Sequence, residues 1–232
     1  VRTVDTVIAG VSVVRILPTR KNLNKDKILL NLHSGGFLVG SAVSMGLLES
    51  IPVAAQTDME VISIQYSQAP EFVFPAASVD VASVYKEILK KYEPKNIGIF
   101  GVSSGGLLTA QSVAWLVNEK LPVPGAIAIL SASADAKWAG DSWFWQKPFL
   151  GMSSPPSLDE RFYYGNHDLN DSLMSPIESD EILKKFPPTL LIAGTRSPEL
   201  SSAVNTHRKL TQRNIDARLH LWDGMGHAFF TN

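Results

Sequence analysis

The chain has 232 residues, no cysteine, and 21 Lys and Arg against 22 Asp and Glu, so its formal net charge is −1. The lack of cysteine excludes disulfides, thiolate metal sites and a cysteine nucleophile, and the near-neutral charge argues against nucleic acid as a partner. A hydrophobic fraction of 45% in a chain of this length is typical of one globular domain, so residues 1–232 are expected to form a single α/β domain. No apolar run reaches about 18 residues, so we expect no membrane span and a soluble protein, with the cytoplasm favoured. The possibility that a signal peptide has been removed stays open, because the sequence does not begin with Met.

Strand and helix patterns alternate along the chain. Two segments of alternating polar and apolar residues around Gly10 predict a β-hairpin, and residues 21–27 predict a charged turn. The later strand segments are almost unbroken apolar runs, which is typical of strands covered on both faces. The expected strands are residues 4–8, 11–17, 28–32, 61–66, 96–102, 126–130, 189–193 and 217–222. The expected helices are residues 47–57, 75–94, 107–117, 181–186 and 200–213. This alternation predicts an α/β fold with a mainly parallel central sheet and helices on both faces.

Residues 135–182 interrupt the alternation. The segment is rich in Trp, Pro, Ser and Gly and lacks clear periodicity, so we interpret it as an irregular, aromatic-rich insertion. Its aromatic cluster consists of Trp138, Trp143, Phe144, Trp145 and Phe149. These side chains either pack the insertion against the sheet or cover a substrate, and such a cluster can also form a homodimer interface.

Residues 101–105, Gly-Val-Ser-Ser-Gly, match the G-x-S-x-G pattern between a buried strand and a buried helix. A serine on a tight strand-to-helix turn exposes its hydroxyl, and the glycines leave space for that turn. The helix N-terminus then points at a developing oxyanion. We therefore predict that Ser103 is a nucleophile. The alternatives are a turn that only packs or one that binds phosphate, and the lack of a following Lys weakens the second.

A second glycine motif, His-Ser-Gly-Gly-Phe at residues 33–37, follows the expected strand 28–32. Consecutive glycines let backbone N–H groups approach a substrate oxygen without obstruction by a Cβ atom. We predict an oxyanion hole made by the N–H groups of Gly35, Gly36 and Ser104, with His33 in a structural role. The alternative is an ordinary turn that ends a strand.

His227 is the predicted general base. Hydrolases with a G-x-S-x-G turn between a strand and a helix carry their catalytic triad in the chain order Ser, Asp or Glu, then His. Among five histidines, only His227 follows the last expected strand on a loop flanked by glycine. Its neutral imidazole would accept the Ser103 proton and return it to the leaving alcohol.

The acid is expected in the loop after residues 189–193. Ser197 stands where an aspartate is expected, and Glu199 is the nearest carboxylate. Glu199 is our candidate acid, because its longer side chain can reach the imidazole around the turn. It could instead be a solvated residue in the first turn of the next helix. Asp135, Asp223 and the Ser197 hydroxyl remain as alternatives.

Together these segments resemble the bacterial hormone-sensitive-lipase-like (family IV) esterases of the α/β-hydrolase superfamily. The resemblance rests on five sequence blocks of the family. They are H-G-G-G-F at residues 33–37, Y-R-x-A-P-E with F-P-A-A at residues 66–71 and 74–77, G-D-S-A-G-G at residues 101–106, G-T-R-D at residues 194–197, and G-M-x-H-A-F at residues 224–229. The chain departs from the family at Ser34, Val102 and Ser197. For residues 1–232 we also expect a reduced or absent N-terminal cap and no helix after the histidine, as in a minimal core or a trimmed form. The resemblance covers nearly the whole chain.

The resemblance implies hydrolysis of small, short-chain carboxylic esters through a serine acyl-enzyme, with no metal or organic cofactor. Because Ser197 replaces the aspartate, the alternative is a catalytically weak or inactive homologue that binds a small ligand. The family includes plant hormone receptors of that type. An acyltransferase or lactonase with the same nucleophile is a third interpretation.

Overall fold

The computed structural model describes residues 1–19, 24–146 and 162–231. Across these residues runs one eight-stranded sheet in the order β1-β2-β4-β3-β5-β6-β7-β8. The strands are β1 (Arg2–Ile8), β2 (Val11–Leu17), β3 (Asn24–Leu32), β4 (Met59–Ile64), β5 (Ile97–Val102), β6 (Ala126–Leu130), β7 (Thr189–Gly194) and β8 (Ala217–Trp222). The predicted β1–β2 hairpin is confirmed, and β2 is also antiparallel to β4. All pairings from β4 through β8 are parallel, as the sequence predicted.

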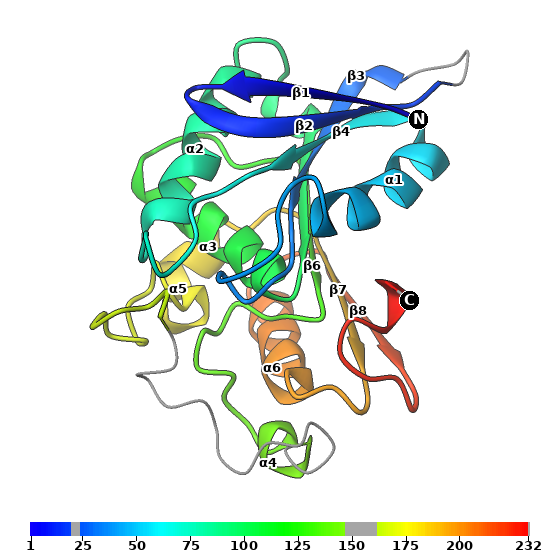
Figure 1. Ribbon diagram of the computed structural model, residues 1–232. Coiled ribbons are helices and arrows are strands. Elements are labelled where there is room, and N and C mark those ends of the chain that lie inside the picture. The colour runs from blue at the N-terminus through cyan, green and yellow to red at the C-terminus, as the bar shows by residue number, and fades with distance from the viewer. Residues whose placement is uncertain (20–23, 147–161, 232) are drawn as a thin grey trace.

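Helices cover both faces of this sheet. They are α1 (Met45–Thr57), α2 (Ala76–Ile88), α3 (Ser104–Asn118), α4 (Ser142–Gln146), α5 (Asp180–Leu183) and α6 (Leu200–Thr211). On one face, Ala54 of α1 belongs to a small core with Ile16 and Val61. On the other face, a larger core takes side chains from α2, α3 and α6. Figure 1 shows α1 on one side of the sheet and α2 and α3 on the other. The predicted α/β architecture is therefore confirmed.

The helix α3 is buried along nearly its whole length, as its all-round apolar sequence predicted. Two of its hydroxyl groups donate to backbone carbonyls within the helix. Thr109 donates to the carbonyl oxygen of Gly105 at 2.8 Å, and Ser112 donates to that of Leu108 at 2.7 Å. Burial of a side chain such as Leu108 contributes about 1.5–3 kcal/mol. The helix that begins at the predicted nucleophile is thus fixed in the centre of the fold.

Several boundaries differ from the sequence prediction. Residues 24–27 belong to β3 rather than to a charged turn, because Asn24 pairs with Met59 and a bulge separates it from Ile28. The helix expected to reach Pro94 ends at Ile88. Pro94 instead begins a short 3-10 helix, since its ring cannot continue a helical hydrogen-bond ladder. The helix α4 was missed, because its five residues are too few to show a period.

The irregular segment contributes to the core. Tyr163 and Met174 are buried in the larger core, and the Phe37 ring stacks on Tyr163 at 4.1 Å. Phe149, one member of the predicted aromatic cluster, lies outside the described residues. Within the described ranges, none of the helices combines the length and the apolar composition needed to cross a bilayer.

Candidate active site

Ser103 lies on a sharp turn between β5 and α3. Its φ of +57° and ψ of −122° place a residue with a side chain in a sparsely populated backbone region. Such a conformation costs about 1–3 kcal/mol and persists only where the surroundings enforce it. Here the Ser103 N–H donates to the Leu130 carbonyl at 2.9 Å, and the Ser103 carbonyl accepts from the Leu107 N–H at 3.1 Å. The neighbouring strand and the first helical turn therefore hold Ser103 in place.

The turn at Ser103 also packs directly against the end of β3. A Cβ atom on Gly105 would lie 1.8 Å from the Leu32 carbonyl oxygen, and one on Gly101 would lie 2.3 Å from the Gly105 backbone. Real Cβ atoms essentially never approach other atoms within 3.0 Å. The two glycines of the G-x-S-x-G pattern are thus required by backbone packing, as the sequence predicted.

His227 lies in the loop after β8 and reaches Ser103. Its Nε2 is 2.9 Å from the Ser103 Oγ, and its side chain is 28% exposed. The following residue anchors the loop, because the Ala228 N–H donates to the Ser131 hydroxyl at 3.0 Å. The centre of the Trp138 ring lies 6.2 Å from that of the imidazole. Ser103 and His227 thus meet at hydrogen-bonding distance from loops that are 124 residues apart.

Glu199 contacts the other nitrogen of the same imidazole. Its Oε2 is 3.0 Å from the His227 Nδ1, and its Oε1 accepts a 2.5 Å hydrogen bond from the Ser197 hydroxyl. A carboxylate only accepts hydrogen bonds, so Nδ1 carries the proton and Nε2 is free to accept from Ser103. Burial acts to raise the pKa of Glu199, but the hydrogen bonds and charge of His227 and the bond from Ser197 outweigh it, and the pKa is lowered. Glu199 is 0% exposed, so it is not the solvated residue of the alternative interpretation.

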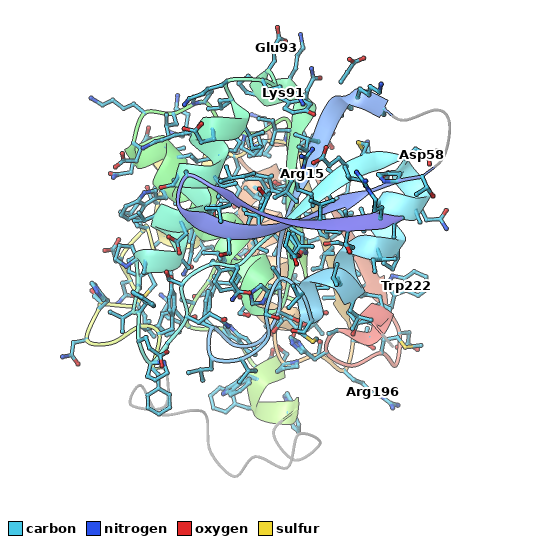
Figure 2. All side chains as sticks on the ribbon, turned by 45° about the horizontal axis from the view of Figure 1, so that its top comes forward. Arg15, Asp58, Lys91, Glu93, Arg196 and Trp222 are labelled. Carbon is cyan, nitrogen blue, oxygen red and sulfur yellow. The ribbon has the colours of Figure 1, made fainter. Side chains whose placement is uncertain are left out.

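The loops after β7 and β8 are bonded to each other. The Thr195 N–H donates to the Trp222 carbonyl, and the Arg196 N–H donates to the Met225 carbonyl, both at 2.9 Å. A Cβ on Gly194 would lie 2.0 Å from the Met225 carbonyl oxygen. Arg196 is exposed and its side chain points away from the protein (Figure 2). Glu199, three residues later, is buried. This backbone pairing sets the acid loop and the histidine loop in register.

Two other carboxylates were candidates for contact with His227. Asp135 accepts instead from the backbone N–H groups of Lys137 and Ala139, both at 3.0 Å. Asp223 accepts from the Thr195 hydroxyl at 3.1 Å. Of the carboxylates in the described ranges, Glu199 has the ion-pair contact with His227. In the same ranges, no group of three or more His, Asp or Glu is placed to hold a metal ion.

The glycine loop after β3 approaches the turn at Ser103. Gly35 has a φ of +135°, and a Cβ there would lie 1.8 Å from the Val39 carbonyl oxygen, so only glycine fits. The Gly36 N–H points at the turn and donates to the Ser104 hydroxyl at 2.9 Å. The structure therefore joins the glycine loop to the residue that follows Ser103, through the Gly36 N–H.

Buried side chains fix this glycine loop from behind. The His33 Nδ1 donates to the Ser34 carbonyl at 2.8 Å, and its ring stacks on Tyr66 at 4.3 Å. Burial lowers the pKa of His33, so the ring is neutral and structural. Glu49 accepts from the Ser34 N–H and from the Asn31 amide, both at 3.0 Å. Glu49 was not identified from the sequence as a residue that supports the glycine loop. The signal that could have identified it is a glutamate on the inward face of the expected helix.

The aromatic cluster of the irregular segment divides into two parts. Trp138 and Trp143 pack edge to face at 5.4 Å, next to His227. Phe144 and Trp145 are 64% and 74% exposed. Trp138 thus lies beside the site, whereas these two side chains of α4 lie mainly in solvent.

A family model for the alpha/beta hydrolase fold matches residues 29–231. An esterase of Fusarium pseudograminearum is 27% identical over 207 residues, which are 85% of this chain and 64% of that protein. The crystal structure of an esterase called E25 has a TM-score of 0.87 and 32% identity, and covers 100% of this chain and 71% of its own. The crystal structure of an esterase from the bacterial hormone-sensitive lipase family has a TM-score of 0.88 and 27% identity. It covers 99% of this chain and 77% of its own. The chain therefore spans less than two thirds of the length of the fungal esterase.

Proposed function

The chain belongs to the α/β-hydrolase fold family and is hormone-sensitive-lipase-like, and on this basis we propose that it is a carboxylesterase that uses a Ser103 acyl-enzyme. The observation that carries the proposal is the row of hydrogen bonds from Ser103 through His227 to Glu199. Relatives called esterases support the reaction class. Small, short-chain esters are the proposed substrates.

In the first half of the reaction, the Ser103 Oγ forms a bond to the ester carbonyl carbon while its proton moves to the His227 Nε2. The carbonyl oxygen becomes an oxyanion, for which the N–H groups of Gly35, Gly36 and Ser104 are the proposed donors. Glu199 stabilises the imidazolium and holds its orientation. When the bond to the alcohol oxygen breaks, His227 donates its proton to that oxygen and the alcohol leaves.

In the second half, water attacks the acyl carbon and His227 accepts a proton from it. The tetrahedral intermediate collapses, the carboxylic acid leaves, and the proton returns to the Ser103 Oγ. Each proton transfer uses one nitrogen, Nε2, because Glu199 keeps the proton of Nδ1 in place. The strained backbone at Ser103 contributes to this cycle, because it presents the hydroxyl to the imidazole.

The test is hydrolysis of p-nitrophenyl butyrate by the wild type and by Ser103→Ala. We expect kcat/KM to fall by at least about 10³-fold, because loss of the nucleophile removes the covalent route. Ser112→Ala is a matched control: it removes another buried hydroxyl, on α3, that bonds only the Leu108 carbonyl. Its activity should stay close to that of the wild type.

Equal rates for the wild type and Ser103→Ala would overturn the proposal. Saturable binding of the ester without turnover would instead support the small-molecule-binding alternative. Product analysis with competing alcohols separates a hydrolase from an acyltransferase.

A further inference from the structure

The side chain of Ser104 engages one of the N–H groups that the proposed reaction needs. We infer that the Ser104 hydroxyl competes with the substrate oxygen for the Gly36 N–H and thereby restrains hydrolysis. This inference rests on the proposed esterase function, and concerns the side chain of Ser104 rather than its backbone N–H.

The Ser104 hydroxyl oxygen is buried and bonded to the glycine loop. Its Oγ accepts from the Gly36 N–H at 2.9 Å, and the residue is 6% exposed. The Tyr66 hydroxyl, which lies nearby, donates its only proton to the His33 carbonyl at 2.7 Å. The Gly36 N–H and the Tyr66 O–H are thus each engaged with one acceptor.

This hydrogen bond determines what the Gly36 N–H can do for an oxyanion. Toward the glycine loop, the Ser104 hydroxyl is an acceptor. The Gly36 N–H has one proton, and it points at the Ser104 Oγ. A substrate oxygen must either displace this oxygen or rely on the N–H groups of Gly35 and Ser104.

Tyr66 is a buried neighbour of this contact. It is 1% exposed, and its ring is fixed by stacking on His33. Burial is the main cause that raises the pKa of Tyr66, so its proton stays on the phenol oxygen and remains bonded to the His33 carbonyl. The competing contact joins a backbone N–H to a serine hydroxyl, and neither group ionises at ordinary pH values.

The expected size of the effect follows from the net strength of one hydrogen bond. Releasing the Gly36 N–H from Ser104 should raise turnover about two- to tenfold, because a neutral hydrogen bond in a protein contributes that factor on balance. The G-D-S-A-G-G block that residues 101–106 resemble has alanine at this position. A methyl group there removes the competing oxygen and leaves the backbone N–H in place.

The experiment compares kcat/KM of the wild type and Ser104→Ala on p-nitrophenyl acetate, together with the Ki of an alkyl trifluoromethyl ketone. This ketone forms an oxyanion when the nucleophile adds to it, so it reports on the same N–H groups. We expect Ser104→Ala to raise kcat/KM two- to tenfold and to lower Ki by a similar factor. Ser104→Cys keeps nearly the original size but offers a weaker acceptor, so it should shift both quantities in the same direction.

The matched control is Thr109→Val, which removes a buried hydroxyl that bonds the Gly105 carbonyl from the same helix. It should not lower Ki. A lower or unchanged kcat/KM with a higher or unchanged Ki in both Ser104 variants, at unchanged melting temperature, would overturn the inference. Failure of the esterase proposal is separate, because it would appear as an absence of Ser103-dependent hydrolysis in the wild type itself.

Discussion

The turn at Ser103 and the loop at residues 194–199 both deliver one side chain to His227, but they tolerate sequence change very differently. At Ser103, a Cβ on Gly105 would lie 1.8 Å from the Leu32 carbonyl oxygen, so the backbone itself defines the position. In the acid loop, Ser197 stands where the resembled family carries aspartate, and Glu199 reaches the imidazole from two residues further on. Where backbone packing holds a catalytic position, the residue types around it are fixed. Where a side chain only has to reach its partner, the residue can lie at a different position in the loop.

The largest expected effect comes from the backbone-defined region. Gly105→Ala should reduce kcat/KM by at least about 10²-fold, because the added methyl pushes the turn away from β3 and displaces Ser103 by roughly an ångström. The melting temperature should also fall. The measurements are hydrolysis of p-nitrophenyl butyrate and thermal unfolding.

Gly226→Ala is the control for Gly105→Ala. A Cβ on Gly226 would meet nothing within 4 Å, although the residue adjoins His227. Its rate should stay within a few-fold of the wild type. If both variants lost activity equally, steric packing at the turn would not be the reason for the glycine.

The next effect concerns the acid. Glu199→Gln should slow turnover at least about tenfold with little loss of folding, because an amide neither stabilises the imidazolium nor holds the Nδ1 proton. The measurements are kcat and the melting temperature. An unchanged kcat would mean that turnover does not need the Glu199 carboxylate.

A rescue experiment makes the comparison between the two regions sharper. Adding Ser197→Asp to Glu199→Gln places a carboxylate where the resembled family has one. If the acid only has to place a carboxylate within reach of the His227 Nδ1, the double variant should recover at least part of the lost kcat. A double variant no faster than Glu199→Gln would mean that the loop geometry, and not only the side chain, has changed in this protein.

The fold was predictable because long apolar runs and turn residues act locally. Strands β2, β6 and β8 have the predicted bounds, and Pro75 lies immediately before α2, as expected. Boundaries set by tertiary pairing were less predictable, as at Asn24, which joins β3 only through its partner on β4. The sequence patterns of Ser103 and the glycine loop identified backbone positions, because glycine is required by close approach.

Side-chain partners in the site could not be predicted in the same way. The contact of Glu199 with His227 depends on the pairing of β7 with β8 and on the hydrogen bonds between the loops that follow them. The bond from Gly36 to Ser104 joins residues 68 apart in the sequence. Glu49 holds the glycine loop from a helix whose sequence alone does not identify its partner. Such pairings are products of the whole fold.

The smallest predicted effect tests how Ser197 serves the acid. Its hydroxyl donates to Glu199 at 2.5 Å, and this bond is one of the causes that lower the pKa of Glu199. The catalytic form needs Glu199 ionised, and activity is lost as the pH falls through its pKa. Ser197→Ala should raise that pKa, so the acid limb of the profile of kcat/KM against pH should move to higher pH. At neutral pH the rate should fall only about two- to tenfold.

Ser202→Ala is the matched control for Ser197→Ala. Its hydroxyl is equally buried but donates to the Glu199 backbone carbonyl at 2.9 Å and not to the carboxylate. The control should leave the acid limb in place, even if it lowers the melting temperature. A shift of the acid limb in both variants would mean that the pKa responds to general loosening of the loop. A shift in Ser197→Ala alone would mean that the Ser197 hydroxyl stabilises the ionised form of Glu199. Ser197 would then assist the acid from the position at which the resembled family carries its aspartate.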